Sequence, residues 1–285
     1  MRGVFALSLA LAAFPVALCA QWPDYPTRGI PKTAAGKPKL DGPAPRTADG
    51  HPDLSGVWEN VPGNIGRPPA GFPPLDGPPP PPPPPASSGP PAATFFNIGA
   101  GFKDGKLPLK PWAAELLKKR TDENSKDNPD AHCLPMGLMQ LHEHPQPRKI
   151  IQTPAVTLII YEANSGLRQI FTDGRPLPPK DAEPWWYGYS VGHWAGDTLV
   201  VETTGFRDDV WLDVNGSPLT NAGKMIEKYR RPVYGKLDIE VTIDDPSAYT
   251  KPFTVRVNQR IMLNTDLIEF ICSENERSDT HLVGK

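Results

Sequence analysis

Cysteine is scarce in this sequence, and its spacing argues against the usual cysteine-based sites. The chain has 3 cysteines among 285 residues, and none belongs to a C-x-x-C pair of the kind that binds structural zinc. Cys19 lies in an N-terminal segment that we expect to be removed, which leaves Cys133 and Cys272. Two remaining cysteines in an oxidising compartment usually form a disulfide, and we expect one here. Two buried free thiols are the alternative.

The sequence also lacks an excess of charge of either sign. It has 30 Lys and Arg against 32 Asp and Glu, for a formal net charge of −2. A nearly neutral chain with interspersed signs has no basic surface for nucleic acid or for an anionic membrane. We therefore expect neither among its partners.

Several sequence motifs that indicate a specific cofactor or metal site are missing. There is no P-loop, no G-x-G-x-x-G after an expected strand, no H-E-x-x-H and no haem-binding C-x-x-C-H. Each of these patterns places a phosphate, a dinucleotide, zinc or haem by a defined mechanism. We expect no cofactor.

An uninterrupted apolar run occurs only at the N-terminus. Residues 1–20 have one positive charge, at Arg2, followed by an apolar run, which is typical of a secretory signal peptide and too short to span a membrane. We therefore expect a soluble protein exported to the periplasm or the exterior of a bacterium. A lipoprotein acylated at Cys19 is the alternative, which the large Leu18 disfavours.

Proline is abundant, with 38 residues, more than half of them before residue 92. Residues 21–53 are expected to form an extended arm, in which residues 32–42 and 46–56 share Thr, Ala, Gly, Pro, Leu and Gly positions. This echo predicts two similar turns. A proline-rich loop is expected at 62–94, where the run from Pro78 to Pro85 must adopt polyproline II. The run is either a docking site for a partner protein or a plain insertion.

Short strands separated by tight turns dominate the rest of the chain. We expect four hairpins, with turns at residues 164–166, 195–197, 234–235 and 264–266. With a strand around Trp58 they predict an all-β fold of about eight to nine strands. The expected architecture is an antiparallel meander that forms a barrel or a strongly curved sheet.

This single β domain is expected to cover residues 54–273, with a C-terminal tail at 274–285. One short helix is predicted at 110–121, where a proline in the first turn precedes good helix formers. In residues 237–244 and 253–260, apolar positions alternate with charged ones, acids in the first strand and bases in the second. Cross-strand ion pairs on a solvated face explain the pattern, and a polar barrel lumen is the alternative.

Two resemblances support this fold. The Gly56-x-Trp58 step resembles the G-x-W signature of the calycins, the lipocalin-like barrels in which the Trp plugs one end. The stretches WWYGYSVG, GDTLVVETTGF and EVTIDDPSAYTKP resemble a family of secreted bacterial proteins of unassigned function. The second resemblance implies export and a β-rich fold and implies no activity.

Aromatic residues crowd the segment from Glu183 to Phe206. On a strand through residues 187–194, Tyr187, Tyr189 and His193 share one face. Aromatic surfaces with polar tips suit a ligand that contains a flat ring or a sugar, and they equally suit a protein core. The candidate ligand-binding residues are Trp185, Trp186, Tyr187, Tyr189 and Trp211.

The same segment offers groups for acid–base chemistry. His193 and Glu202, together with Asp173 and Arg175, could act as acid, base and anion holder in a hydrolase or isomerase. The alternative is a structural Glu202 paired with Arg175, Lys228 or Arg230. A metal hypothesis rests on His142 and His144, because His-x-His on a strand points both imidazoles the same way and could bind zinc or copper; exposed loop histidines are the alternative.

Taken together, these patterns favour an exported β-barrel-like protein that binds a small aromatic or glycosidic ligand. The alternatives are a secreted hydrolase or isomerase that uses His193 and Glu202 in the same cavity, and a surface interaction module that docks through its polyproline run.

Overall fold

The computed structural model describes residues 25–61, 89–272 and 274 of the chain. The predicted signal peptide, the proline run from Pro78 to Pro85 and nearly all of the C-terminal tail lie outside the described residues. The same holds for most of the predicted loop at 62–94.

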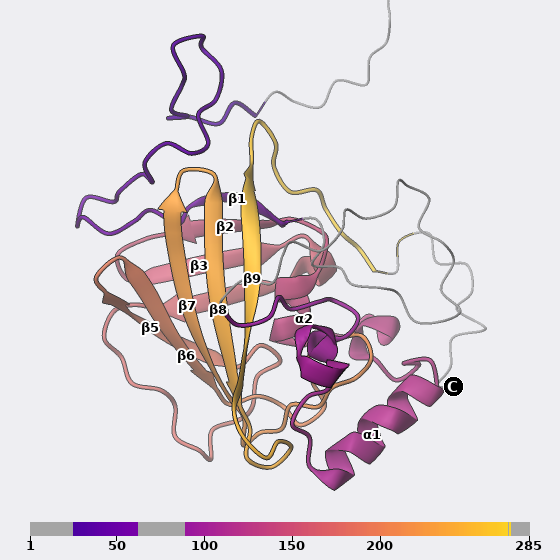
Figure 1. The fold of residues 1–285 in the computed structure, drawn as a ribbon. Coiled ribbons are helices and arrows are strands. Elements are labelled where there is room, and N and C mark those ends of the chain that lie inside the picture. Colours follow the sequence, from indigo (N-terminus) through magenta and orange to yellow (C-terminus); the bar gives the residue numbers. More distant parts are fainter. Residues whose placement is uncertain (1–24, 62–88, 273, 275–285) are drawn as a thin grey trace, which may run out of the picture.

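Nine strands close into a barrel, in which each strand pairs with its neighbours in the sequence and β9 pairs with β1 (Figure 1). The strands are β1 (Gly56–Asn60), β2 (Arg148–Gln152), β3 (Val156–Tyr161), β4 (Leu167–Phe171), β5 (Tyr189–Ala195), β6 (Thr198–Thr204), β7 (Lys224–Val233), β8 (Lys236–Asp244) and β9 (Phe253–Met262). The prediction of an all-β barrel is confirmed.

The alternating pattern of β8 and β9 sets which face turns inward. Leu237, Ile239, Val241 and Ile243 of β8 are buried, as are the apolar positions of β9. The charged positions face outward, with Glu240 in register with Arg256 and paired with Arg230 at 3.3 Å. The charged faces are therefore solvated, and the alternative of a charged lumen built from them is wrong.

Two details of the expected topology are wrong. Within the described residues, no strand follows the turn at 264–266, because β9 already pairs with β1; the segment beyond it is held instead by a bond from the Ile268 amide to Glu162. The barrel still has nine strands because β2, which lies before the first expected hairpin, forms an additional strand. The pairing of β4 with β5 is parallel rather than antiparallel, since the chain crosses over through residues 172–188 before it enters β5.

The predicted helix is confirmed as α1 (Pro111–Asp122), which lies outside the barrel (Figure 1). A second helix, α2 (Leu138–Glu143), was not expected, and all six of its residues are buried. Its start touches the backbone of Trp211 so closely that a Cβ on Gly137 would lie 2.0 Å from the Trp211 carbonyl oxygen. Short 3₁₀ turns complete the fold at Ile98–Gly101, Lys103–Gly105, Pro129–His132 and Ala163–Ser165.

Trp58 fills the barrel near the turn between β7 and β8. Its side chain is fully buried, and its indole N–H donates to the Leu54 carbonyl at 3.0 Å. The Arg231 guanidinium lies 4.9 Å from the centre of the Trp58 ring and donates to the carbonyls of Asp53 and Tyr234. Burying the indole and satisfying both polar groups closes this part of the barrel to water.

The arm contains the two similar turns that its sequence echo predicts. The amide of Thr33 bonds to the Lys37 carbonyl at 2.8 Å, and the amide of Thr47 bonds to the His51 carbonyl at 2.9 Å. Among the contacts between described residues, only the second turn is anchored to the barrel by side chains: Arg46 pairs with Asp197, and His51 stacks on Trp194 with ring centres 4.6 Å apart.

Cys133 and Cys272 form the expected disulfide, with their Cα atoms 5.6 Å apart. The bond joins residues 139 positions apart and fixes the segment after β9 to the loop before α2. None of the described helices is both long and apolar enough to cross a membrane.

We expect loss of this disulfide to lower the thermal stability of the protein. Cross-linking so long a loop restricts the unfolded chain and contributes about 4–5 kcal/mol in chain-entropy models. The measurement is the melting temperature of the oxidised protein, the reduced protein and a Cys133→Ser/Cys272→Ser variant. The double variant should melt with the reduced protein and be insensitive to reductant; equal melting of all three would contradict the expectation.

Candidate functional site

The barrel interior holds a network of polar side chains around one ion pair. Glu227, on the inward face of β7, accepts a bond from Arg168 of β4 at 2.9 Å, and a second bond joins the other nitrogen and oxygen of the pair. Both side chains are at most 2% exposed. We call this cluster the barrel network; it comprises His142, Tyr161, Arg168, Ser190, Thr203, Glu227 and Tyr229.

The remaining members surround this ion pair and satisfy its other polar atoms. Ser190 and Thr203 accept bonds from Arg168 at 3.0 and 2.9 Å. From α2, His142 Nε2 lies 2.8 Å from a Glu227 oxygen, and the Tyr161 hydroxyl lies 3.2 Å from His142 Nδ1. This arrangement places the imidazole proton on Nε2 and lets Nδ1 accept from Tyr161.

The pKa values of the network follow from burial and from the ion pair. Burial opposes ionisation of Glu227, but the Arg168 charge and the bond from His142 outweigh it, so the pKa of Glu227 is lowered. Burial lowers the pKa of His142 below its usual value, and the neighbouring arginines act in the same direction. The network therefore contains an ionised Glu227 and a neutral His142 at neutral pH.

No member of the barrel network offers an open position to a substrate. Every polar side-chain atom of its members has a hydrogen-bond partner, and all seven side chains are buried. A polar group without free donors or acceptors and without access to water cannot bind a ligand. We conclude that the network stabilises the barrel and is not a ligand site.

One catalytic pattern in the sequence falls inside this network. Gly188, Ser190 and Gly192 match the G-x-S-x-G pattern of hydrolases. In those enzymes the Ser occupies an exposed strand-to-helix turn. Here Ser190 lies within β5, is 1% exposed and bonds to Arg168 and Thr203. The pattern is therefore not a nucleophile elbow.

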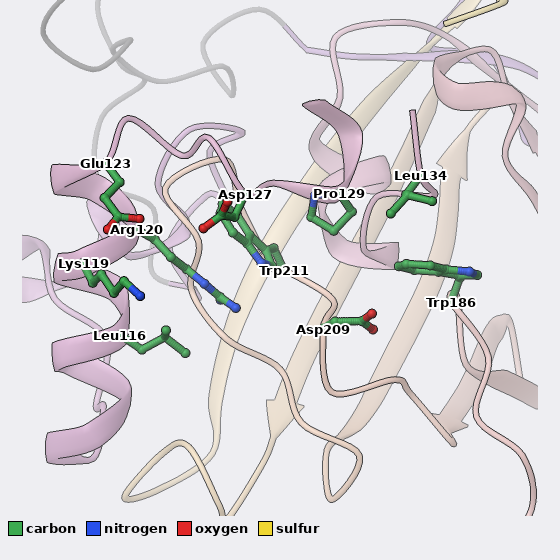
Figure 2. Close-up of a pocket in the computed structure, with 10 residues that line it drawn as sticks. All are labelled: Leu116, Lys119, Arg120, Glu123, Asp127, Pro129, Leu134, Trp186, Asp209 and Trp211. Carbon is green, nitrogen blue, oxygen red and sulfur yellow. The ribbon is translucent and has the colours of Figure 1, made fainter. Parts of the chain in front are cut away.

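An open cavity of about 280 Å³ lies outside the barrel, between α1 and the loops that carry Trp186 and Trp211 (Figure 2). We call it the Trp groove. Its lining combines these two indoles with three side chains of α1, three carboxylates and the apolar Pro129 and Leu134.

Trp211 and Arg120 form the wall of the Trp groove next to α1. The Arg120 guanidinium lies 4.3 Å from the centre of the Trp211 ring and donates to the Gly216 carbonyl at 2.8 Å. Gly216 has a φ of 98°, and a Cβ there would lie 2.5 Å from Arg120 Cδ. Only glycine permits this stacked arrangement. Burial lowers the pKa of Arg120 to about 10.

The loop behind this wall is fixed by a buried carboxylate. Asp213 accepts bonds from the amides of Ile98, Gly216 and Ser217 at 2.8–2.9 Å. Its side chain is fully buried, and burial raises its pKa despite these bonds. Asp213 thus sets the backbone that carries Trp211 and Gly216.

At the other end of the Trp groove, Trp186 is half-buried and covered on one side by a cation. The Arg207 guanidinium lies 4.3 Å from the centre of its ring and pairs with Asp209 at 2.8 Å. Figure 2 shows the Trp186 ring between Leu134 and Asp209, away from α1. Trp186 therefore presents an aromatic surface at a fixed place in the cavity.

The structure divides the predicted ligand-binding residues into separate places. Trp186 and Trp211 lie together in the Trp groove. Trp185 and Tyr189 form an exterior cluster, with ring centres 5.3 Å apart, and Phe171 stacks on Tyr189. Tyr187 is half-buried near Gly166, and burial raises its pKa to about 12.

The predicted acid–base residues all lie at the outer surface. His193 is exposed on β5, and no described hydrogen bond or ion pair joins it to Glu202. Glu202 pairs with Lys224 at 3.6 Å rather than with the partners that we considered. Asp173 and Arg175 pair with each other at the solvent-exposed end of β4, where Arg175 also bonds to Tyr189.

His142 and His144 do not point toward one site. The stretch is the end of α2 rather than a strand, so the two rings diverge: His142 enters the barrel network, whereas His144 packs edge-on against Phe95 at 4.9 Å. Burial lowers the pKa of His144 to about 4. Within the described residues, no group of three or more His, Cys, Asp or Glu is arranged to hold a metal ion.

A larger hollow, of about 590 Å³, lies between the arm and the barrel. Two of its three basic residues are already bound within the protein, since Lys149 pairs with Asp266 at 2.7 Å and Arg231 donates to backbone carbonyls. It contains no pair of indoles. We therefore regard the Trp groove as the better candidate site.

Comparisons with protein-family models, with curated proteins and with solved structures found no match to this chain. The resemblances to the calycins and to a family of secreted bacterial proteins therefore stay predictions.

We expect Glu227→Gln to destabilise the protein strongly. The change leaves the buried charge of Arg168 without its partner, which costs about 3–5 kcal/mol. Glu202→Gln is the matched control, because it removes a surface pair worth at most about 1 kcal/mol. Denaturant unfolding at neutral pH measures both, and equal effects of the two changes would contradict a central role for the ion pair.

Glu143 of α2 provides a test that depends on pH. It is 1% exposed, and neither of its carboxyl oxygens has a hydrogen-bond partner. Burial, helped by the charge of Asp213, raises the pKa of Glu143 well above its usual value. Above about pH 4.3, the pKa of a Glu carboxyl in the unfolded chain, Glu143 must therefore take up a proton when the protein folds. The free energy of unfolding consequently falls as the pH rises.

We expect Glu143→Gln to increase the free energy of unfolding relative to the unsubstituted protein, by an amount that grows from pH 4 to pH 8. Glu115→Gln, at an exposed position of α1, serves as the control. Denaturant unfolding across this range measures the difference, which should be near zero at the acidic end. A difference that does not change with pH would mean that Glu143 is not protonated in the folded state.

Proposed function

We propose that this protein is an exported β-barrel that binds one small ring-containing ligand, aromatic or glycosidic, in the Trp groove. The observation that supports this proposal is the convergence of the half-buried Trp186 ring with charged side chains on one open cavity, whose wall near α1 is formed by Arg120 stacked on the buried Trp211. The two indoles come from different loops and are brought together by the fold.

The chemistry of the Trp groove suits such a ligand. Indole faces stack on flat rings and on the apolar faces of sugars, while nearby charged groups bond to hydroxyl or carboxyl substituents. The volume of about 280 Å³ lies just below the usual lower limit for ligand pockets, about 300 Å³. We therefore propose a ligand of one or two rings.

The proposed site lies in the Trp groove outside the barrel, and not on the aromatic face of the strand that the sequence predicts through residues 187–194. The barrel network fills the interior between β4 and β7, and His193 is exposed on the outer face of β5. No described hydrogen bond or ion pair joins His193 to Glu202, the proposed acid and base of a hydrolase or isomerase, and general acid–base catalysis requires a base within hydrogen-bond reach of the proton that it moves. Binding is therefore better supported than catalysis.

Export is part of the same proposal. It is supported by the signal-peptide pattern of residues 1–20 and by the disulfide between Cys133 and Cys272, since disulfides persist in oxidising compartments. The resemblance to secreted bacterial proteins agrees with it.

We expect Trp186→Ala to weaken binding of a ring-containing ligand by about tenfold or more, which corresponds to about 1.4 kcal/mol. The reason is the loss of the stacking surface at the far end of the Trp groove. Isothermal titration calorimetry against monosaccharides and phenolic compounds measures the affinity. Intrinsic fluorescence provides a second signal because both indoles line the cavity.

Trp112→Ala is the matched control. Trp112 is an exposed tryptophan on α1, 44% accessible, that does not line the Trp groove. The Trp112→Ala variant should bind the ring-containing ligand with the affinity of the unsubstituted protein. Thermal denaturation should show that both variants are folded. The proposal fails if no ring compound binds at millimolar concentration, or if Trp186→Ala binds unchanged.

A further inference from the structure

Resting on the proposed function, we infer that the ligand of the Trp groove is a ring-containing acid whose carboxylate binds Arg120. Two acids that line the cavity already pair with cations outside it, whereas its own two cations form no ion pair among the described residues.

Two of the three acids that line the Trp groove form ion pairs with cations outside it, but the two basic residues that line it form no ion pair among the described residues. Glu123 pairs with Lys126 at 3.4 Å, and Asp209 pairs with Arg207 at 2.8 Å. Among the described residues, neither Lys119 nor Arg120 forms an ion pair. The cavity thus has positive charge to offer at its α1 wall.

The negative charges that face Arg120 do not neutralise it by contact. Asp127 and Asp213 both raise its pKa through space, yet burial outweighs them and the pKa falls to about 10. Asp213 already accepts bonds from the backbone and from Ser217. Asp127 is exposed at the rim, within reach of water. Arg120 therefore keeps its charge at neutral pH without a carboxylate in contact.

Arg120 is also held in a position to bind a carboxylate. Its guanidinium is stacked on Trp211 and donates one described bond, to the Gly216 carbonyl. A guanidinium has five N–H donors in a planar fork, and a carboxylate can accept two of them side by side. Because the group is already ordered and partly removed from water, less conformational entropy is lost when an anion binds.

The two ends of the Trp groove differ in chemistry, which fixes the orientation of the ligand. Figure 2 shows Lys119 and Arg120 extending from α1 at one end, and Trp186 at the other. The ring of the ligand would therefore lie toward Trp186, and its carboxylate toward α1. A sugar acid and an aromatic acid both satisfy this arrangement, and affinities for the two classes distinguish between them.

The test compares acids with neutral compounds of the same ring. Calorimetry would use D-glucuronate against D-glucose, and 4-hydroxybenzoate against 4-hydroxybenzyl alcohol. In at least one pair the acid should bind about tenfold more tightly or better, the equivalent of about 1.4 kcal/mol for a charge-assisted contact. The pair that shows the preference identifies the class of ring.

Variants assign that preference to Arg120. Arg120→Gln should abolish the difference between acid and neutral compound, and Arg120→Lys should retain part of it because the charge stays while the fork is lost. Lys118→Gln, which removes a neighbouring cation of α1 that pairs with Asp122, should leave it unchanged. Thermal denaturation checks that each variant is folded.

Equal affinity for acids and neutral compounds would overturn this inference and leave the proposed function standing. So would an acid preference that persists in Arg120→Gln while Lys118→Gln behaves like the unsubstituted protein. If no compound of either charge binds, the proposed function itself fails, and the inference fails with it.

Discussion

The buried ion pair between Arg168 and Glu227 is the interaction on which the rest of the structure depends. It joins β4 to β7, two strands that are not neighbours in the barrel, and it is therefore made across the interior. Removing two charges from water is costly, and it is tolerated here because Ser190, Thr203 and the other members of the network satisfy the remaining polar atoms. A barrel filled in this way is a scaffold, and the ligand site that we propose lies outside it.

The same network positions the outer site through α2. His142, near the end of α2, bonds to Glu227 inside the barrel, while Gly137, at the start of that helix, touches the backbone of Trp211. The helix thus links the barrel interior to one wall of the Trp groove. Asp213 fixes the same loop from its other side through three backbone amides. The indole of Trp211 is consequently held by packed, buried elements, which suits a preformed site.

What the sequence predicted correctly depends on neighbours along the chain. Strand alternation, turn residues and the helix at 110–121 are local signals, and so is the repeated turn of the arm. The barrel network was missed because Glu227 looks like a surface residue until its alternation with Met225 and Tyr229 is followed along β7. The Trp groove was missed because Arg120, Trp186 and Trp211 are far apart in the sequence and only the tertiary fold brings them together. The parallel pairing of β4 with β5 likewise has no local signal.

The aromatic segment from Glu183 to Phe206 illustrates why a cluster in sequence need not be a cluster in space. It begins as a turn and continues as β5, so consecutive rings leave the chain in different directions. Trp185 joins Tyr189 outside the barrel, Trp186 lines the Trp groove, and Trp194 stacks on His51 of the arm. The segment is neither one core nor one ligand site. Of its three tryptophans, Trp186 alone lines the Trp groove, where Lys119 and Arg120 form no ion pair among the described residues. This combination of a half-buried ring with a fixed cation is the basis for proposing recognition rather than packing.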